Sequence, residues 1–136
     1  MGISSNAMLY FGFPVGDYDE PPAFLEGREN EDGTTEAFDD LICEIAGLPA
    51  DSDYKTRMVA IKACPAEMQS YCSYDWPRFL LCVRGAEHIV YRGYTAEINS
   101  ENLAVAPEKI EAFKSWCESN NIPWQEPKWL LCSMYG

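Results

Sequence analysis

The sequence has few of the residues that most often carry catalysis or bind metals. It contains a single histidine, His88, and its six cysteines include no C-x-x-C pair, the spacing that is typical of zinc sites. Its glycines form no G-x-G-x-x-G, Walker or G-x-S-x-G motif, and an H-E-x-x-H motif is also absent. We therefore predict no catalytic residue, no metal site and no cofactor, and the sequence leaves an enzyme open without favouring one.

Basic residues are also scarce. The chain has 22 acidic and 10 basic residues and a formal net charge of −12, so it lacks the surplus of Lys and Arg that binds phosphates. Direct binding to nucleic acid or to an anionic membrane surface is therefore not expected. No apolar run approaches 18 residues, and the first residues do not form a signal-peptide pattern. We expect a cytoplasmic protein.

The length of 136 residues predicts one domain spanning 1–136. Its apolar content of 47% and aromatic content of 13% are enough for an ordered core. Residues 1–7 are interpreted as a disordered tail or a cloning remnant, because Ser5-Asn6-Ala7 precedes a second methionine, Met8. Most cysteines have apolar neighbours and no secretory signal precedes them, which predicts free, buried thiols.

The net charge is confined to the first 53 residues, which hold 13 acids and one base, whereas residues 54–136 hold nine of each. The densest part is segment 16–33, with seven acids, three glycines and two prolines. This composition predicts an exposed acidic loop, held to the protein by its one apolar island at 21–25. The loop is interpreted either as a solvated surface or as a recognition surface for a basic partner.

Hydrophobic periodicity predicts an α+β fold, with a mainly antiparallel sheet of about five strands and two main helices covering one face. The predicted strands are 8–15, 57–63, 79–83, 88–98 and 128–134, and the main helices are 35–46 and 107–120. Residues 65–72 are expected to form a short helix. The strands 79–83 and 88–98 are expected to form a hairpin that turns at Arg84-Gly85-Ala86-Glu87, with a bulge at Gly93.

An aromatic segment, YCSYDWPRF at 71–79, is interrupted by a proline, so some of its rings are expected to lie exposed in a loop. Exposed Tyr and Trp side chains commonly anchor protein partners, although the same rings could instead cover the core. We predict a small interaction or inhibitor protein that binds a basic protein partner, and mimicry of the charge of nucleic acid is the strong version of this hypothesis. The predicted partner-binding residues are Asp17, Asp19, Glu20, Glu29, Glu31, Asp32, Tyr74 and Trp76.

The alternative interpretation is a small-ligand binder or a cysteine/histidine-dependent enzyme. The predicted hairpin would gather Arg78, Arg84 and Arg92 into a weak anion-binding patch. It would also place Cys82 diagonal to His88, which permits a thiol and its general base to meet without requiring it. The sequence sets neither the identity of a partner nor the oligomeric state.

Overall fold

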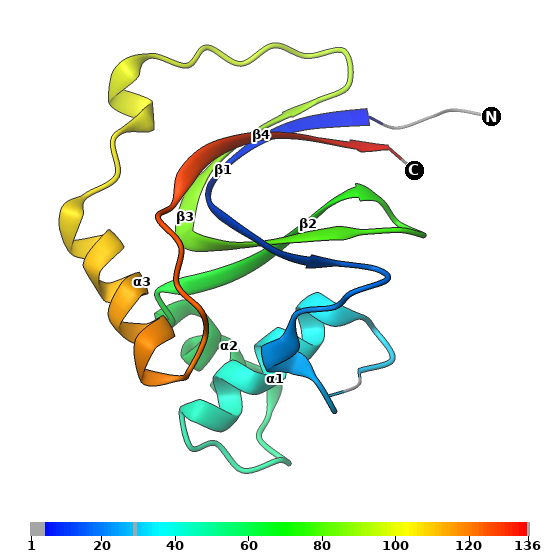
Figure 1. Ribbon diagram of the computed structural model, residues 1–136, viewed down its shortest axis with the longest axis vertical. Coiled ribbons are helices and arrows are strands. Elements are labelled where there is room, and N and C mark those ends of the chain that lie inside the picture. Colours follow the sequence, from blue (N-terminus) through cyan, green and yellow to red (C-terminus); the bar gives the residue numbers. More distant parts are fainter. Residues whose placement is uncertain (1–4, 29, 136) are drawn as a thin grey trace.

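The computed structural model describes residues 5–28 and 30–135, and this part of the chain forms four strands and three α-helices (Figure 1). The strands are β1 (Ser5–Asp17), β2 (Ala66–Ser73), β3 (Arg78–Tyr91) and β4 (Lys128–Tyr135). The helices are α1 (Thr34–Ile45), α2 (Tyr54–Ala63) and α3 (Pro107–Ser119), with short 3-10 turns η1 (Ala23–Leu25) and η2 (Ser100–Leu103). The predicted α+β class is confirmed. The sheet is mixed and has four strands rather than about five, and there are three helices rather than two.

The four strands close into one curled sheet in the order β1-β3-β2-β4. β1 runs antiparallel to both β3 and β4, and β2 runs antiparallel to β3. The contact that closes the sheet is short and parallel, and it pairs Cys72 with Met134 and Ser73 with Tyr135. This contact fixes the end of β2 beside the C-terminal strand.

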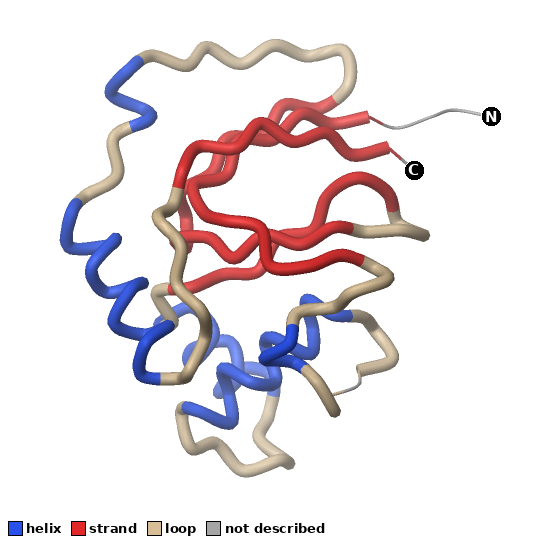
Figure 2. The backbone as a smooth tube through the Cα atoms, in the orientation of Figure 1, coloured by secondary structure: helices blue, strands red, loops and turns tan. Residues whose placement is uncertain are grey.

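The three helices gather on one side of the strands (Figure 2) and share one apolar core with them. Phe38 of α1, Ile61 of α2 and Phe113 of α3 all belong to this core, together with Phe13 of β1 and Leu81 of β3. Burial of a large apolar side chain contributes about 1.5–3 kcal/mol relative to leaving it exposed. This core therefore holds the helical layer and the sheet together.

A second, smaller apolar cluster brings together side chains of β1, β3 and β4. It contains Met8, Tyr10, Leu80, Cys82 and Cys132. Removal from water raises the pKa of both the Tyr10 hydroxyl and the Cys82 thiol, because each is harder to ionise in an apolar environment. Both groups are therefore neutral parts of the core.

The predicted hairpin between 79–83 and 88–98 is wrong. Residues 78–91 form one continuous strand, β3, and both of its halves pair with β1 rather than with each other. The predicted turn coincides with an irregularity in this pairing, where the register passes from Tyr10 opposite Glu87 to Gly12 opposite Cys82. Gly85, with φ +82°, lies within the irregularity. The sequence therefore indicates a real irregularity near Gly85, but this irregularity lies within one strand that pairs with β1 and is not a turn between two strands.

Two other sequence predictions fail in the middle of the chain. Residues 57–63, predicted as a strand, belong to helix α2, which begins where the Asp53 carboxylate accepts the backbone N–H of Thr56 at 2.8 Å. Residues 65–72, predicted as a short helix, lie mostly in β2, where pairing with β3 outweighs the helical preference for proline at a first turn.

The remaining elements lie near their predicted positions. The expected helices 35–46 and 107–120 correspond to α1 and α3, and the expected strands 8–15 and 128–134 lie within β1 and β4. Residues 92–106 leave the sheet, so the strand expected over 88–98 ends at Tyr91, and Gly93 lies in the turn that follows rather than in a bulge. No helix of the described chain has the length and apolar character needed to cross a membrane.

Candidate functional site

The acidic loop, residues 16–33, is folded against the protein. Pro22 and Leu25 are buried, and the Phe24 ring packs against Phe38 of α1 with ring centroids 6.0 Å apart. The Asp17 carboxylate accepts the backbone N–H of Glu20 at 2.8 Å and closes the turn that follows β1. The apolar island predicted to hold the loop does so, because its buried residues anchor the loop backbone to the protein.

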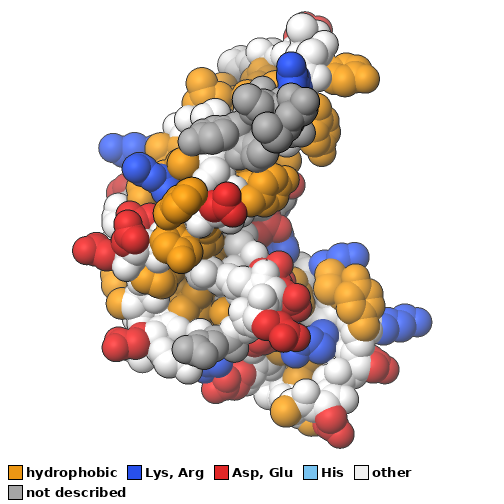
Figure 3. All heavy atoms as spheres, turned by 90° about the vertical axis from the view of Figure 1, so that its right-hand side faces the viewer, with side chains coloured by type: hydrophobic (Ala, Val, Ile, Leu, Met, Phe, Trp, Pro, Cys, Tyr) orange, Lys and Arg blue, Asp and Glu red, His pale blue; other side chains and the backbone are white. Residues whose placement is uncertain are grey.

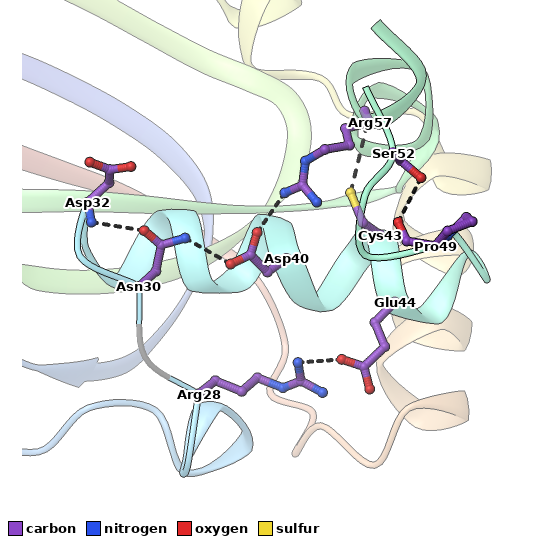
Figure 4. Close-up of polar contacts among 9 residues, drawn as sticks. All are labelled: Arg28, Asn30, Asp32, Asp40, Cys43, Glu44, Pro49, Ser52 and Arg57. Carbon is purple, nitrogen blue, oxygen red and sulfur yellow. Dashed lines mark hydrogen bonds and ion pairs between the residues drawn. The ribbon is translucent and has the colours of Figure 1, made fainter. Parts of the chain in front are cut away.

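Polar contacts tie the second half of the acidic loop to α1 (Figure 4). Asn30 donates from Nδ2 to the Asp40 carboxylate at 2.8 Å and accepts the backbone N–H of Asp32 at the same distance. Arg28 forms an ion pair with Glu44, with 2.6 Å between nitrogen and oxygen. These contacts place Asp32 directly before the first turn of α1.

Several acids of the first 53 residues therefore form ion pairs or hydrogen bonds within the protein. Asp40 also pairs with Arg57 of α2 at 2.6 Å, Glu44 pairs with Arg28, and Asp53 caps α2. By contrast, Asp19, Glu20 and Asp32 are exposed, and their carboxylates form no hydrogen bond or ion pair within the described chain. These three are among the charges that remain available to a partner.

The aromatic loop, which we define as residues 74–77 between β2 and β3, presents two exposed rings. Tyr74 retains 75% of its accessible surface and Trp76 retains 63%. The backbone N–H of Trp76 donates to the Ser73 hydroxyl at 3.0 Å, and Ser73 is the one buried polar residue of the described chain. Cys72 has φ +82°, a left-handed conformation that is unusual for a residue other than glycine, at the point where the chain enters this loop.

The acidic loop and the aromatic loop meet. Tyr18 and Trp76 are in edge-to-face contact, with ring centroids 6.5 Å apart. Between the loops lies a cleft of about 400 Å³, which we call the acidic–aromatic cleft. Its lining includes Tyr18, Asp32 and the first turn of α1, together with Tyr74 and Asp75 of the aromatic loop and with Ser70, Ser73, Phe79 and Met134.

The charge of this cleft has one sign. Asp32, Glu36 and Asp75 contribute carboxylates to its lining, and no lysine, arginine or histidine of the described chain lines it. Figure 3 shows acidic and large apolar side chains next to one another on the face of the molecule that corresponds to the right-hand side of Figure 1. Such a surface attracts a cation and offers it apolar contact at the same place.

The predicted partner-binding residues separate into groups. Asp17, Asp19 and Glu20 flank Tyr18 in sequence, while Asp32 and Tyr74 line the acidic–aromatic cleft and Trp76 lies beside it. Glu31 instead lines a neighbouring hollow between the acidic loop and α1. Glu29 lies outside the described residues.

Sequence reasoning did not single out Tyr18, Glu36 or Asp75. Tyr18 and Asp75 each lie between residues that were selected, so their position in the chain was the available signal. Glu36 lies in the first turn of α1, where an acid is favourable, and its place at the cleft depends on tertiary packing.

The three arginines of the predicted anion patch are spread along and beyond β3. Arg84 is held by the backbone oxygens of Cys64 and Ala66, at 2.8 and 3.0 Å, and by an ion pair with Glu67 at 2.9 Å. Arg78 is exposed at the start of the strand, and Arg92 is exposed after its end. The hairpin expected to gather them does not form.

His88 lies in a different environment from Cys82. Its Nε2 is 2.9 Å from the backbone oxygen of Asn102, and its ring lies 5.6 Å from that of Trp129, at the edge of a pocket of about 150 Å³. Cys82 is buried in the second apolar cluster, where its raised pKa keeps the thiol protonated. The structure therefore does not form the Cys82–His88 pair that the hairpin implied.

The predicted free thiols are confirmed. All six cysteines are free in the structure, and five of them are buried, whereas Cys72 is partly exposed. No group of three or more His, Cys, Asp or Glu side chains within residues 5–28 and 30–135 is arranged to hold a metal ion. Comparison of the chain with protein-family models, curated proteins and solved structures found no match.

Proposed function

We propose that this protein is a small interaction or inhibitor protein that binds a basic protein partner through the acidic loop and the aromatic loop together. The observation that carries the proposal is the contact between Tyr18 and Trp76, which joins the two loops around the acidic–aromatic cleft. Two features that are separate in sequence thereby form one surface.

This surface has the composition of a protein-binding site. Exposed Tyr and Trp side chains supply large contact areas at a low cost in conformational entropy, and they frequently dominate binding energy. The surrounding carboxylates of Asp19, Glu20 and Asp32 are exposed and available, so they attract a basic partner and raise its rate of association. The net charge of −12 extends this attraction beyond the contact surface.

The charge also favours one kind of partner. A basic protein surface that normally contacts phosphates, such as that of a nucleic-acid-binding enzyme or a toxin, would be attracted to these carboxylates, and occupation of that surface would inhibit it. The six free cysteines are in keeping with a reducing compartment, so we propose that the encounter takes place in the cytoplasm.

Capture of binding proteins from host lysate at low salt tests the proposal with two variants of equal charge. The face variant carries Asp32→Asn and Asp75→Asn in the lining of the cleft, and Asp19→Asn and Glu20→Gln next to Tyr18 in sequence. The control variant carries four exposed substitutions elsewhere, Asp51→Asn, Glu111→Gln, Glu118→Gln and Glu126→Gln.

We expect the parent and the control variant to recover the same basic protein and the face variant to lose it. Recovery by all three chains, or by none of them, would contradict the proposal. Thermal unfolding of each chain provides the check on folding, because exposed charges of this kind have little effect on stability.

A second candidate function is binding of a small anion beside His88. The pocket there is lined by His88, Lys109 and Trp129 together with Arg84 and Glu87, so it combines cationic groups with an aromatic wall. Arg84 already satisfies three internal acceptors, which leaves Lys109 as the available cation of this pocket, beside the His88 ring. Titration with inorganic phosphate, followed through the His88 ring signals by NMR, tests this candidate.

A further inference from the structure

We propose that the acidic–aromatic cleft receives one arginine side chain of the partner protein. This inference rests on the proposed function and deepens it, because it names the group that the surface recognises and the place where that group lies. The occupant is a guanidinium group carried by a polypeptide.

The size and shape of the cleft fit an inserted side chain. Its volume of about 400 Å³ falls within the range of roughly 300–1,000 Å³ that is usual for ligand pockets, and it is larger than the pocket of about 150 Å³ beside His88. Phe79 and Met134 are among its lining residues, together with Ser70 and Ser73. The cleft thus combines apolar residues, which suit an aliphatic stem, with polar and acidic ones, which suit donor groups.

The carboxylates of the cleft come from two separate parts of the fold. Asp32 and Glu36 belong to the start of α1 and the residues before it, whereas Asp75 belongs to the aromatic loop. A cation in the cleft is therefore attracted by the acidic residues of both segments. Because no basic residue of the described chain lines the cleft, this negative charge has no neutralising partner in its lining.

The aromatic rings favour arginine over lysine. Tyr18 and Tyr74 both line the cleft and remain largely exposed, and Trp76 is in edge-to-face contact with Tyr18. A planar guanidinium stacks on such rings and donates to two carboxylates at once, while an ammonium group is compact and more strongly hydrated. The combination of ring surface and acidic residues from two separate segments therefore matches the guanidinium better.

The site is also held in position before a partner arrives. The Ser73 hydroxyl holds the backbone N–H of Trp76 at 3.0 Å, and the left-handed conformation of Cys72 turns the chain into the aromatic loop. In the acidic loop, Asn30 fixes Asp32 through its backbone N–H. A site that is ordered in advance loses less entropy on binding.

The test is an NMR titration of the full chain with three peptides that differ at one side chain. The probe is the acetylated, amidated peptide Gly-Gly-Arg-Gly-Gly, and the comparison peptides carry lysine or citrulline in place of arginine. Citrulline has nearly the shape of arginine and no charge. We expect the arginine peptide to shift the Trp76 indole signal and the Tyr18 and Tyr74 ring signals at millimolar concentrations. The citrulline peptide should bind roughly three- to tenfold more weakly.

Two single variants locate the site. Asp75→Asn removes one carboxylate of the cleft, and Tyr74→Leu removes one ring while keeping an apolar side chain; each should weaken binding of the arginine peptide by roughly two- to fivefold. The control, Glu126→Gln, removes one exposed charge outside the cleft and should leave binding unchanged. The dispersed backbone signals of each variant report whether it remains folded.

The inference is overturned if the arginine peptide leaves the Tyr18, Tyr74 and Trp76 signals unmoved, or if the citrulline peptide shifts them equally. Its failure is distinguishable from failure of the proposed function. If the peptide fails but the face variant still loses the captured protein, the acidic surface acts without an arginine site. If the peptide binds but the face variant keeps the captured protein, the arginine site stands and the proposed function is wrong.

Discussion

Tyr18 and Trp76 lie edge to face with their ring centroids 6.5 Å apart, and this contact joins the loop after β1 to the loop between β2 and β3. Both rings remain more exposed than a core aromatic residue, at 57% and 63%. Their contact therefore places two aromatic side chains at the surface, next to carboxylates, instead of completing the hydrophobic core.

The burial of the cysteines predicts which thiol reacts in the folded protein. Burial raises the pKa of Cys117 to about 12 and also raises the pKa of Cys43, Cys64 and Cys132, whereas Cys72 is partly exposed. We expect a chromogenic thiol reagent to modify Cys72 rapidly in the native protein and six thiols per chain in denaturant. Cys72→Ser should remove the rapid phase. Several rapid thiols, or fewer than six in denaturant, would contradict the structure.

Gly12 marks a close approach of β1 to β3. A Cβ atom at this position would lie 2.1 Å from the backbone oxygen of Leu81 and 2.8 Å from the Cα of Cys82. Gly12→Ala should therefore lower the free energy of unfolding by about 1–3 kcal/mol, measured by urea denaturation.

Gly27→Ala is the comparison for Gly12→Ala. A Cβ atom at Gly27 meets no neighbouring atom, so its cost is limited to the strain of φ +80°, about 1 kcal/mol. If Gly12→Ala proves no more destabilising than Gly27→Ala, the two strands are not packed as closely as the structure shows.

The left-handed backbone at Cys72 predicts an unusual order of stabilities. Glycine adopts φ +82° without a steric penalty, whereas a β-branched side chain is strongly disfavoured there. We expect the free energy of unfolding of Cys72→Gly to exceed that of Cys72→Val by about 1–2 kcal/mol. A more stable valine variant would show that the backbone at this position is extended.

Glu87 predicts a pH-dependent difference in stability. Burial, followed by the nearby charge of Glu67, raises the pKa of the Glu87 carboxyl in the folded protein. Folding therefore favours the protonated form, and the contribution of Glu87 to stability is largest at low pH and decreases as the pH rises through the folded-state pKa. Glu87→Gln should gain stability relative to the parent as the pH is raised from acid to neutral.

Glu118→Gln is the control for Glu87→Gln, because it removes the same charge from an exposed position on α3. Chemical denaturation at several pH values would measure both variants. A gain that is equal in the two variants would reflect net charge alone and would contradict a specific role for burial at Glu87.

Local signals in the sequence predicted the elements that local interactions determine. In α1, Phe38 and Ile42 recur with helical spacing and face the core, and the Gly47 backbone with φ +79° follows the end of the helix as expected. In α2, alternation of apolar residues suggested a strand, but Val59 is exposed and only Ile61 is buried. The capping pair Asp53 and Thr56 was the more reliable signal.

Tertiary pairing could not be obtained in the same way. The bend near Gly85 was visible in the sequence, but only the pairing of both halves of β3 with β1 shows that it is no hairpin. Likewise, both faces of β4 are apolar in sequence and β4 pairs with both β1 and β2, yet Leu131 is 76% exposed. Asp32, Tyr74 and Trp76 of the candidate surface were identifiable, whereas the cleft itself depends on contacts between distant segments.

The most direct measurement is the dissociation constant of the captured basic protein for the parent, the face variant and the control variant, at low salt and at physiological salt. The charge of the two variants is the same, so they differ only in where four carboxylates have been removed. We predict that the face variant binds at least roughly tenfold more weakly than the control variant at low salt. The affinity of the parent should also fall when salt is raised to the physiological concentration, at which the Debye length is roughly 8 Å. Equal affinities of the two variants, together with an affinity of the parent that does not change with salt, would contradict recognition through the acidic–aromatic surface.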